Sequence, residues 1–279
     1  MKYKIIADSS CDLNANYLKD TGIDFDLAPL TLNVNNKEFV DNESLDITEM
    51  LSCMHSFKGK STSACPSPND YEEKMTGADK YFIVTISSKL SGSHSAAVLA
   101  KNSFSNPDDV FVIDSKTVSG TMVLIIDKLV SLINSNIEYE KICEEILNYT
   151  ENNISLLFIL DKFDNLVKNG RVSATKGFIA STLSLKPICE NKDGEIKIAK
   201  LALGHKRAIK ELVEMLKTKT QDHSTKKCVL THCFNEETAK WIKTELENRY
   251  NFKEIILMPM KGLCSFYALE KGLIFSYEK

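Results

Sequence analysis

The chain has 279 residues, of which 43% are hydrophobic and 26% are charged, with 11 glycines and 6 prolines. This composition is typical of a globular protein and excludes a disordered or collagen-like chain. The 35 Lys and Arg residues against 38 Asp and Glu residues give a net charge of −3. We expect no nucleic-acid partner, because domains that bind nucleic acids usually carry a basic excess. The length predicts roughly two domains of about 150 residues each.

The apolar segments are too short for a secretory leader or a membrane span. Residues 1–8 lack the apolar core of a signal peptide. The apolar runs 122–126 and 154–160 fall well below the roughly 20 residues that a membrane helix needs. We therefore expect a soluble, cytoplasmic protein. The 8 cysteines form no CxxC pair, and a chain of this length can build a core without disulfides, so we expect reduced thiols.

The first half of the chain alternates between short apolar runs and helical patterns. Strands are predicted at 3–7, 27–34, 81–86 and 110–113. Helices are predicted after Asp46 and after Ser67, which can cap them, at about 91–104, and from Val118 to Ile133. Strands separated by single helices predict an α/β fold with a mainly parallel sheet covered by helices on both faces. We assign residues 1–151 to this N-terminal α/β domain.

The second half predicts another α/β domain at residues 152–279. Strands are predicted at 155–160, 185–189, 196–199, 228–232, 254–258 and 272–277. Helices are predicted at 174–183, around Ile209 to Leu216 and at 236–250, with a short helix capped by Asp161. The turn sequence Lys192-Asp193-Gly194 predicts a β-hairpin between two of these strands.

Known cofactor motifs are missing from the sequence. His232 lies between Cys228 and Cys233, but this spacing does not match a zinc site, so we expect no metal. The chain has neither the GxxxxGK[ST] nor the GxGxxG nucleotide motif, and no GxSxG serine elbow. We therefore expect no cofactor held by this chain.

Hydroxyl groups are concentrated where predicted strands end. The segments concerned are 8–12, 61–63, 87–93 and 114–115. In a parallel sheet such segments gather at the carboxyl edge, where ligands bind. Each segment taken alone is equally well explained by helix caps and turns. Together they favour a polar pocket, and hydroxyls without an acid–base histidine suit the binding of a carboxylate better than its chemical conversion.

Seven segments, in this order and spacing, resemble the DegV family of fatty-acid-binding proteins. They are 6–13 (IADSSCDL), 28–31 (APLT), 61–68 (STSACPSP), 86–93 (ISSKLSGS), 112–116 (VIDSK), 166–173 (LVKNGRVS) and 183–188 (LSLKPI). The resemblance implies a fold of two α/β domains. It also implies an apolar tunnel for the acyl chain in the C-terminal domain, with the carboxyl group near the domain interface.

The resemblance also implies positions for the ligand contacts. A hydroxyl contact to the carboxyl group falls on Ser63, or on Thr62 if the register shifts by one, and a second falls on Ser91. The neighbouring positions included in the expected site are Gly92, Ser93 and Tyr267. Arg171 corresponds to an arginine associated with kinase docking, the alternative being a surface ion pair. Phe178, Ile179 and Leu183 are expected in the tunnel wall, although ordinary core positions explain them equally well.

The chain departs from the family pattern at three places. The C-terminal His-x-Gly-x-Gly segment is missing, and Tyr267 lies about where the histidine would be. Cys65 replaces a glutamine, and His205-Lys-Arg207 occupies a stretch that is often rich in arginine. A tyrosine can donate a hydrogen bond to a carboxylate, but it does not titrate near neutral pH as a histidine does.

The function implied by the resemblance is that of a carrier without chemistry of its own. The protein would bind a long-chain fatty acid and present its carboxylate to an ATP-dependent fatty acid kinase subunit, which forms an acyl phosphate for phospholipid synthesis. Magnesium and nucleotide would belong to the partner, and transient contact with a membrane is compatible with this role. The alternatives are a hydrolase or transferase that acts on a small carboxylate through Ser63 or Ser91 at the interdomain cleft, and a binder of another amphipathic carboxylate or a phospholipid. The preferred chain length, the degree of unsaturation and the oligomeric state stay open.

Overall fold

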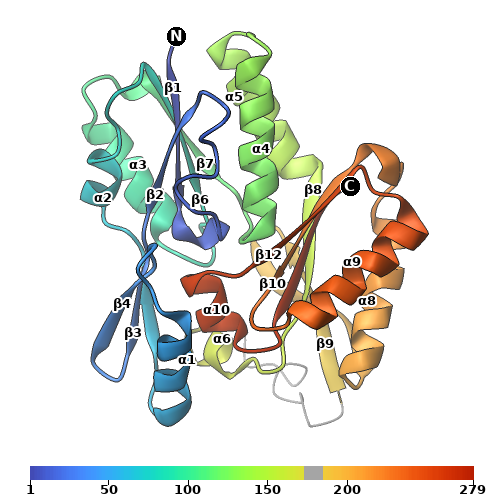
Figure 1. Ribbon diagram of the computed structural model, residues 1–279. Helices are drawn as coiled ribbons and strands as arrows, with labels where there is room; N and C mark the ends of the chain where they lie inside the picture. Colours follow the sequence, from blue (N-terminus) through green and yellow to red (C-terminus); the bar gives the residue numbers. More distant parts are fainter. Residues whose placement is uncertain (173–184) are drawn as a thin grey trace.

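The computed structural model describes residues 1–172 and 185–279 (Figure 1). Its strands are β1 (Tyr3–Asp8), β2 (Asp24–Ala28), β3 (Thr31–Val34), β4 (Lys37–Val40), β5 (Thr62–Ala64), β6 (Lys80–Thr85), β7 (Val110–Asp114), β8 (Ile154–Ile159), β9 (Leu185–Lys192), β10 (Glu195–Leu203), β11 (Lys227–His232), β12 (Glu254–Pro259) and β13 (Leu273–Glu278). Its helices are α1 (Ile47–Ser56), α2 (Pro68–Glu72), α3 (Ser93–Ser103), α4 (Gly120–Asn134), α5 (Tyr139–Asn152), α6 (Asp164–Lys168), α8 (His205–Lys219), α9 (Glu236–Tyr250) and α10 (Gly262–Ala268), with a short 3-10 helix η1 (Ser9–Cys11) after β1.

A four-stranded sheet, in the order β2-β1-β6-β7, forms the centre of the first half, and all its neighbouring strands are parallel. Along β1 the side chains alternate, so that Ile5 and Ala7 pack with α4 and α5, whereas Ile6 packs with α2 and α3. Figure 1 shows these two pairs of helices on opposite sides of the sheet. The predicted parallel sheet with helices on both faces is therefore confirmed.

The single strand predicted at 27–34 was wrong. Leu27 and Ala28 end β2, whereas β3 begins at Thr31 in a separate three-stranded sheet with the order β4-β3-β5. Pro29 lies between the two strands and has no N–H group to continue a ladder of hydrogen bonds. Because apolar side chains are buried on both sides of Pro29, hydrophobicity alone does not mark the change of sheet.

The second half forms a six-stranded sheet in the order β10-β9-β8-β13-β11-β12. Its pairs are antiparallel except for β11 with β12, which are parallel. The predicted hairpin between β9 and β10 is confirmed, with Asp193 (φ 54°) and Gly194 (φ 83°) in the left-handed conformation that such a turn requires. The helices predicted around 209–216 and at 236–250 correspond to α8 and α9, which cover one face of this sheet (Figure 1).

Three further details differ from the sequence analysis or extend it. Helices α5 and α10 had not been predicted. Asp161 does not cap α6, which begins at Asp164; its carboxylate instead pairs with the Lys186 ammonium at 2.6 Å. The helix predicted at 174–183 lies outside the described residues. The six-stranded sheet takes its strands from residues 154–278, and the domain boundary between 151 and 152 stays a prediction.

Helix α4 lies between the two large sheets, which explains why every residue of its first half, from Gly120 to Ile126, is buried. It packs against the parallel sheet through residues such as Met122 and Ile125, and against β11 and β13 at its amino end. The Thr121 hydroxyl donates to the Ser276 hydroxyl at 2.8 Å. A Cβ atom on Gly120 would lie 2.8 Å from Val229, so only glycine permits this close approach.

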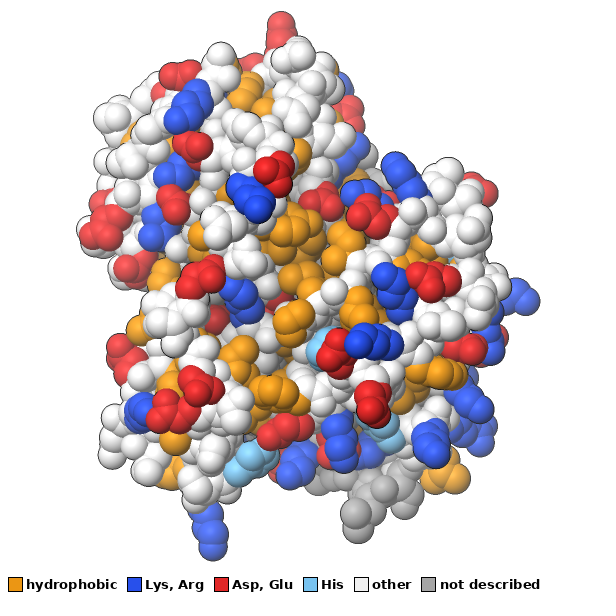
Figure 2. All heavy atoms as spheres, viewed as in Figure 1, with side chains coloured by type: hydrophobic (Ala, Val, Ile, Leu, Met, Phe, Trp, Pro, Cys, Tyr) orange, Lys and Arg blue, Asp and Glu red, His pale blue; other side chains and the backbone are white. Residues whose placement is uncertain are grey.

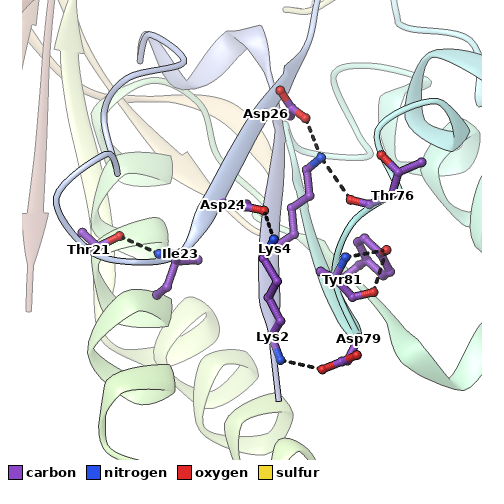
Figure 3. A network of polar contacts seen from close by, with 10 residues as sticks. Lys2, Lys4, Thr21, Ile23, Asp24, Asp26, Thr76, Asp79 and Tyr81 are labelled. Carbon is purple, nitrogen blue, oxygen red and sulfur yellow. Dashed lines mark hydrogen bonds and ion pairs between the residues drawn. The ribbon is translucent and has the colours of Figure 1, made fainter.

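The amino ends of β1 and β2 carry ion pairs at the edge of the parallel sheet (Figure 3). Lys2 pairs with Asp24 at 2.9 Å and Lys4 with Asp26 at 2.6 Å. The Lys4 side chain is only 9% exposed, so its methylene stem is buried while its ammonium group meets the carboxylate at the surface. Exposed pairs of this kind contribute little to stability. They mark the end of the sheet that lies opposite the hydroxyl-rich carboxyl edge.

Charged side chains of both signs are interspersed on the face shown in Figure 2, and hydrophobic side chains gather along the middle, between the two halves of the chain. This face has no large area of a single charge, in agreement with the near-neutral composition. Within residues 1–172 and 185–279, no helix combines the length and the apolar character that crossing a membrane requires.

Three buried carboxyl groups, those of Asp8, Asp12 and Asp41, surround η1 at the carboxyl end of β1. The Asp12 carboxylate accepts hydrogen bonds from the Ser119 hydroxyl at 2.6 Å and from the Lys261 backbone N–H at 2.7 Å. It therefore joins the end of β1 to α4 and to the segment before α10. Burial raises the pKa of Asp12 to about 7, against the opposing effect of these hydrogen bonds.

The raised pKa of Asp12 predicts how stability depends on pH. The folded protein holds this proton more tightly than the unfolded chain, whose aspartates titrate near about 3.9. The stabilisation is therefore complete below about pH 4 and is lost as the pH rises through the folded-state pKa of about 7. We expect Asp12→Asn to flatten the fall in unfolding free energy between pH 4 and 7; its amide oxygen can still accept the Lys261 N–H, and its amide nitrogen can donate to the Ser119 hydroxyl. Urea unfolding of wild type and variant across this range measures the effect, and parallel profiles would contradict it.

Candidate ligand-binding site

An apolar cavity lies on the face of the six-stranded sheet opposite α8 and α9. Strand β8 alternates, so that Leu156 and Phe158 line the cavity, whereas Leu157 and Ile159 pack beneath the helices. Ile274 on β13 extends the wall. The opposite side comes from the first half of the chain, through residues that include Leu30, Ile86 and Val118. The cavity therefore lies between the two halves of the chain.

The cavity is narrow. The centre of a water molecule can reach about 90 Å³ of it, whereas the whole space between the lining atoms, the open mouth included, is about 790 Å³. Most of this space therefore lies within one water radius of a wall. Such a space suits a chain that is one methylene group wide better than it suits a bulky ring system.

Four of the polar side chains in the wall of this cavity were selected by the sequence analysis. They are Ser63 on β5, Ser91 in the loop between β6 and α3, Arg171 after α6, and Tyr267 on α10. The Ser63 hydroxyl and the Tyr267 hydroxyl are 2.9 Å apart and share a hydrogen bond. The structure thus brings together four residues that the sequence analysis had selected, across as many as 204 positions of sequence.

The alternation of β5 determines which of two neighbouring hydroxyls reaches the cavity. Ser63 pairs with Leu32 of β3 and is half-buried in the cavity wall. Thr62 and Ala64 point to the other face of the strand and are exposed. Of the two positions left open by the sequence, Ser63 is therefore the one that lines the cavity.

Helix α10 presents Tyr267, and hydrogen bonds at both ends hold this helix in place. The Asp41 carboxylate accepts the backbone N–H groups of Gly262 and Leu263, both at 2.8 Å, which satisfies free donors at the helix start. The Asn165 amide donates to the Phe266 carbonyl oxygen at 2.8 Å. Burial raises the pKa of Tyr267, whereas the Ser63 hydrogen bond and the nearby guanidinium of Arg171 oppose the rise, so the phenol keeps its proton at neutral pH.

Arg171 lies in the cavity wall, beside the hydroxyl groups. Its Nε donates to the Leu90 carbonyl oxygen at 3.1 Å, and its Nη1 donates to the Asn169 carbonyl oxygen at 2.7 Å. Its guanidinium carbon is 6.0 Å from the centre of the Tyr267 ring. Among the described residues no carboxylate pairs with Arg171, so the alternative of a surface ion pair has no support. Its expected contact with a kinase stays a prediction.

The three residues of the Ser91-Gly92-Ser93 segment differ in their surroundings. Ser91 lines the cavity, and its hydroxyl accepts the backbone N–H of Ser93 at 3.3 Å. Gly92 is exposed, and a Cβ atom there would lie 3.2 Å from the Cys65 sulfur. Ser93 is buried away from the cavity: its hydroxyl donates to the Asp8 carboxylate at 2.5 Å. Only Ser91 of this segment therefore joins the polar cluster.

The sequence analysis placed the tunnel wall at three residues that no described contact tests. Phe178, Ile179 and Leu183 lie outside the described residues. The sequence analysis identified β8 and β13 as strands but did not connect them with a cavity. The apolar residues at 156, 158 and 160 could have indicated a cavity-lining face, because they lie on one side of the strand.

The chemistry of the cavity is that of binding. Among its described lining residues there is no histidine, aspartate or glutamate. Ser63 and Ser91 therefore lack a neighbouring general base that could activate either as a nucleophile. Within the described part of the chain no group of His, Cys, Asp and Glu side chains is arranged to hold a metal ion.

The Ser63–Tyr267 hydrogen bond predicts a measurable coupling in the ligand-free protein. A hydrogen bond between neutral groups contributes about 0.5–1.5 kcal/mol net. We expect Ser63→Ala and Tyr267→Phe each to lower the unfolding free energy, and the double variant to lose less than the sum, with a coupling of about 1 kcal/mol. Urea unfolding of the four proteins of this cycle measures the coupling. Strict additivity would show that the two hydroxyls do not interact.

Comparisons with known proteins show the family to which this chain is similar. The family described as "Uncharacterised protein, DegV family" matches residues 2–277. A DegV domain-containing protein of Streptococcus pneumoniae is 37% identical over 283 residues, covering 100% of this chain and 99% of that protein.

Solved structures of similar proteins contain fatty acids. The fatty acid kinase (Fak) B3 protein of S. pneumoniae, loaded with linoleic acid, is 36% identical and superposes with a TM-score of 0.93, covering 100% of this chain and 99% of that one. A DegV family protein from Eubacterium eligens, loaded with heptadecanoic acid, is 30% identical with a TM-score of 0.92, covering 99% of each chain. The family match and these relatives extend over nearly the whole length, and this chain belongs to the DegV family.

Proposed function

We propose that this protein binds a long-chain fatty acid in the apolar cavity and holds its carboxylate at the cluster of Ser63, Ser91, Arg171 and Tyr267. The observation that carries this proposal is a narrow apolar space whose wall contains neutral hydroxyls and the guanidinium of Arg171, which pairs with no carboxylate of the described residues. The fatty acids in two structures of similar proteins support it.

The apolar tail alone can supply the affinity. A chain of about 16 carbons has about 14 methylene groups, and at roughly 0.8 kcal/mol each their gross transfer free energy is about 11 kcal/mol. The loss of translational freedom and the ordering of the chain take back several kcal/mol. Enough remains for tight binding, so the polar cluster needs only to compensate for the desolvation of the head group and to orient it.

The polar cluster complements a carboxylate. Arg171 supplies positive charge without a competing carboxylate from the described protein, and charge-assisted hydrogen bonds of this kind are stronger than neutral ones. Ser63, Ser91 and Tyr267 supply neutral hydroxyl donors. Because the Tyr267 phenol stays protonated at neutral pH, this donor persists where a histidine would titrate.

The carboxylate would be converted by a partner. In our proposal an ATP-dependent kinase subunit binds at the mouth of the cavity, and a carboxylate oxygen attacks the terminal phosphorus of ATP. The new C–O–P linkage forms as the bond to ADP breaks, and the acyl phosphate stays bound by its tail. Nucleotide and magnesium belong to the partner in this scheme. The proposal places the protein in the cytoplasm, where ATP is available, with transient membrane contact when the product is delivered to phospholipid synthesis.

The binding function is tested by identifying what the cavity holds. The protein is purified without detergent, and its lipids are extracted and analysed by mass spectrometry. We expect long-chain fatty acids in near-stoichiometric amount. A consistently empty cavity, together with failure of the delipidated protein to bind added palmitate, would refute the proposal; a phospholipid in their place would assign a different ligand.

A second experiment separates the carrier from the alternative of a serine hydrolase or transferase. An enzyme would release product from acyl esters or small carboxylate substrates without a partner, and Ser63→Ala or Ser91→Ala would abolish this activity. The cavity has no general base among its described residues, so we expect no turnover by the isolated protein. We expect acyl phosphate only when a fatty acid kinase subunit and ATP are added.

Arg171 provides a test of the head-group contact. We expect Arg171→Gln to weaken binding of palmitate at least tenfold, because a charged hydrogen-bond partner contributes about 1.5–3 kcal/mol. Binding of hexadecanol, which has no charge, should change little. The control is Arg207→Gln, since Arg207 is exposed on α8 and pairs with Glu211 at 2.7 Å. Equal losses for palmitate and hexadecanol would show that Arg171 does not recognise the carboxylate.

A further inference from the structure

Thr117 is a further hydroxyl residue in the wall of the apolar cavity, and its hydroxyl makes no hydrogen bond to Ser63, Arg171 or Tyr267. It lies in the loop between β7 and α4 and is only 3% exposed. It lines the cavity next to Val118. Its Oγ1 atom is buried and has no hydrogen-bond partner in the protein. An unpaired buried hydroxyl destabilises a protein, so this atom calls for an explanation.

The backbone holds Thr117 firmly in this position. Its N–H donates to the Ser115 hydroxyl at 3.1 Å, and its carbonyl oxygen accepts the Ser87 N–H at 2.9 Å. On either side, Lys116 (φ 53°) and Ser119 (φ 62°) adopt left-handed backbone conformations that are unfavourable for these residue types. The unpaired hydroxyl is therefore a property of a well-determined loop, and such strained loops cluster at functional sites.

Thr117 also lies where the apolar cavity meets a second, polar one. The second cavity has about 440 Å³ that the centre of a water molecule can reach, and its lining includes Ser115, Lys116, Lys192 and Lys279. Thr117 and Asn191 line both cavities. A polar group on a bound chain at this place would meet a hydrogen-bonding wall, whereas Leu156 and Phe158 surround the rest of the chain.

We propose that Thr117 determines ligand specificity and that the cavity accepts long-chain carboxylic acids which carry a hydroxyl group along the chain. The inference rests on the proposed fatty-acid binding. The threonine hydroxyl can both donate and accept, so it pairs with a chain hydroxyl in either direction. A plain acyl chain offers Oγ1 no hydrogen-bond partner. A site with an unused hydrogen-bonding group favours the ligand that satisfies it.

The test compares stearate with a series of hydroxystearates that differ in the position of the hydroxyl group. Dissociation constants are measured for wild type, Thr117→Val, which keeps the shape, and Thr117→Ser, which keeps the hydroxyl. We expect at least one positional isomer to bind wild type and Thr117→Ser about tenfold more tightly than it binds Thr117→Val. Stearate should bind all three proteins equally. The position of the favoured hydroxyl then measures how far Thr117 lies from the bound carboxylate.

Several outcomes would overturn the inference. One is that Thr117→Val leaves every isomer unchanged; another is that it weakens stearate and all hydroxystearates alike. A lower melting temperature of ligand-free Thr117→Val would also overturn it, because it would show that Oγ1 has a partner within the protein. Failure of wild type to bind stearate would refute the proposed function itself, whereas stearate binding without any effect of Thr117→Val refutes only the role of Thr117.

Discussion

The architecture depends on the need to bury both faces of the six-stranded sheet. Helices α8 and α9 cover one face, where Leu157 and Ile159 pack. The other face meets α4 and lies opposite residues such as Ile86 and Val118 in the loops at the carboxyl edge of the parallel sheet. The apolar cavity is the space left between them, lined by Leu156 and Phe158. The apolar cavity thus forms where the two sheets pack on either side of one shared helix, α4.

Hydrogen bonds between polar groups at this junction position α10 and the polar side chains of the cavity wall. The buried carboxyl groups of Asp12 and Asp41 accept hydrogen bonds from backbone and hydroxyl donors and so hold α10 against the first half. Tyr267 is thereby placed within hydrogen-bond distance of Ser63. Arg171 is anchored through carbonyl oxygens, which leaves its charge uncompensated by any carboxylate among the described residues. The cavity therefore offers positive charge and hydroxyl donors at one place, beside apolar walls.

This arrangement separates affinity from orientation. The tail is recognised by apolar contact, which is non-directional and grows with chain length. The head group is recognised by directional donors, which decide where its oxygens lie. This separation of tail recognition from head-group recognition suits a protein that presents a reactive group to another protein while it keeps the tail out of water. The proposed role of Thr117 would add a third element, since a hydroxyl in the apolar wall would distinguish chains by what they carry along their length.

The sequence by itself predicted most of the alternating strands and helices, the hairpin at Asp193-Gly194, and hydroxyl positions at Ser91 and at either Thr62 or Ser63, because local hydrophobic period, turn chemistry and motif order are properties of neighbouring residues. It did not determine that Pro29 separates two sheets, because buried residues lie on both sides of it. Nor did it place Arg171 beside Tyr267, show which face of β8 borders a cavity, or reveal the unpaired hydroxyl of Thr117. These features depend on how the two sheets pack around α4, and contacts between residues far apart in the sequence are set by tertiary packing rather than by local sequence.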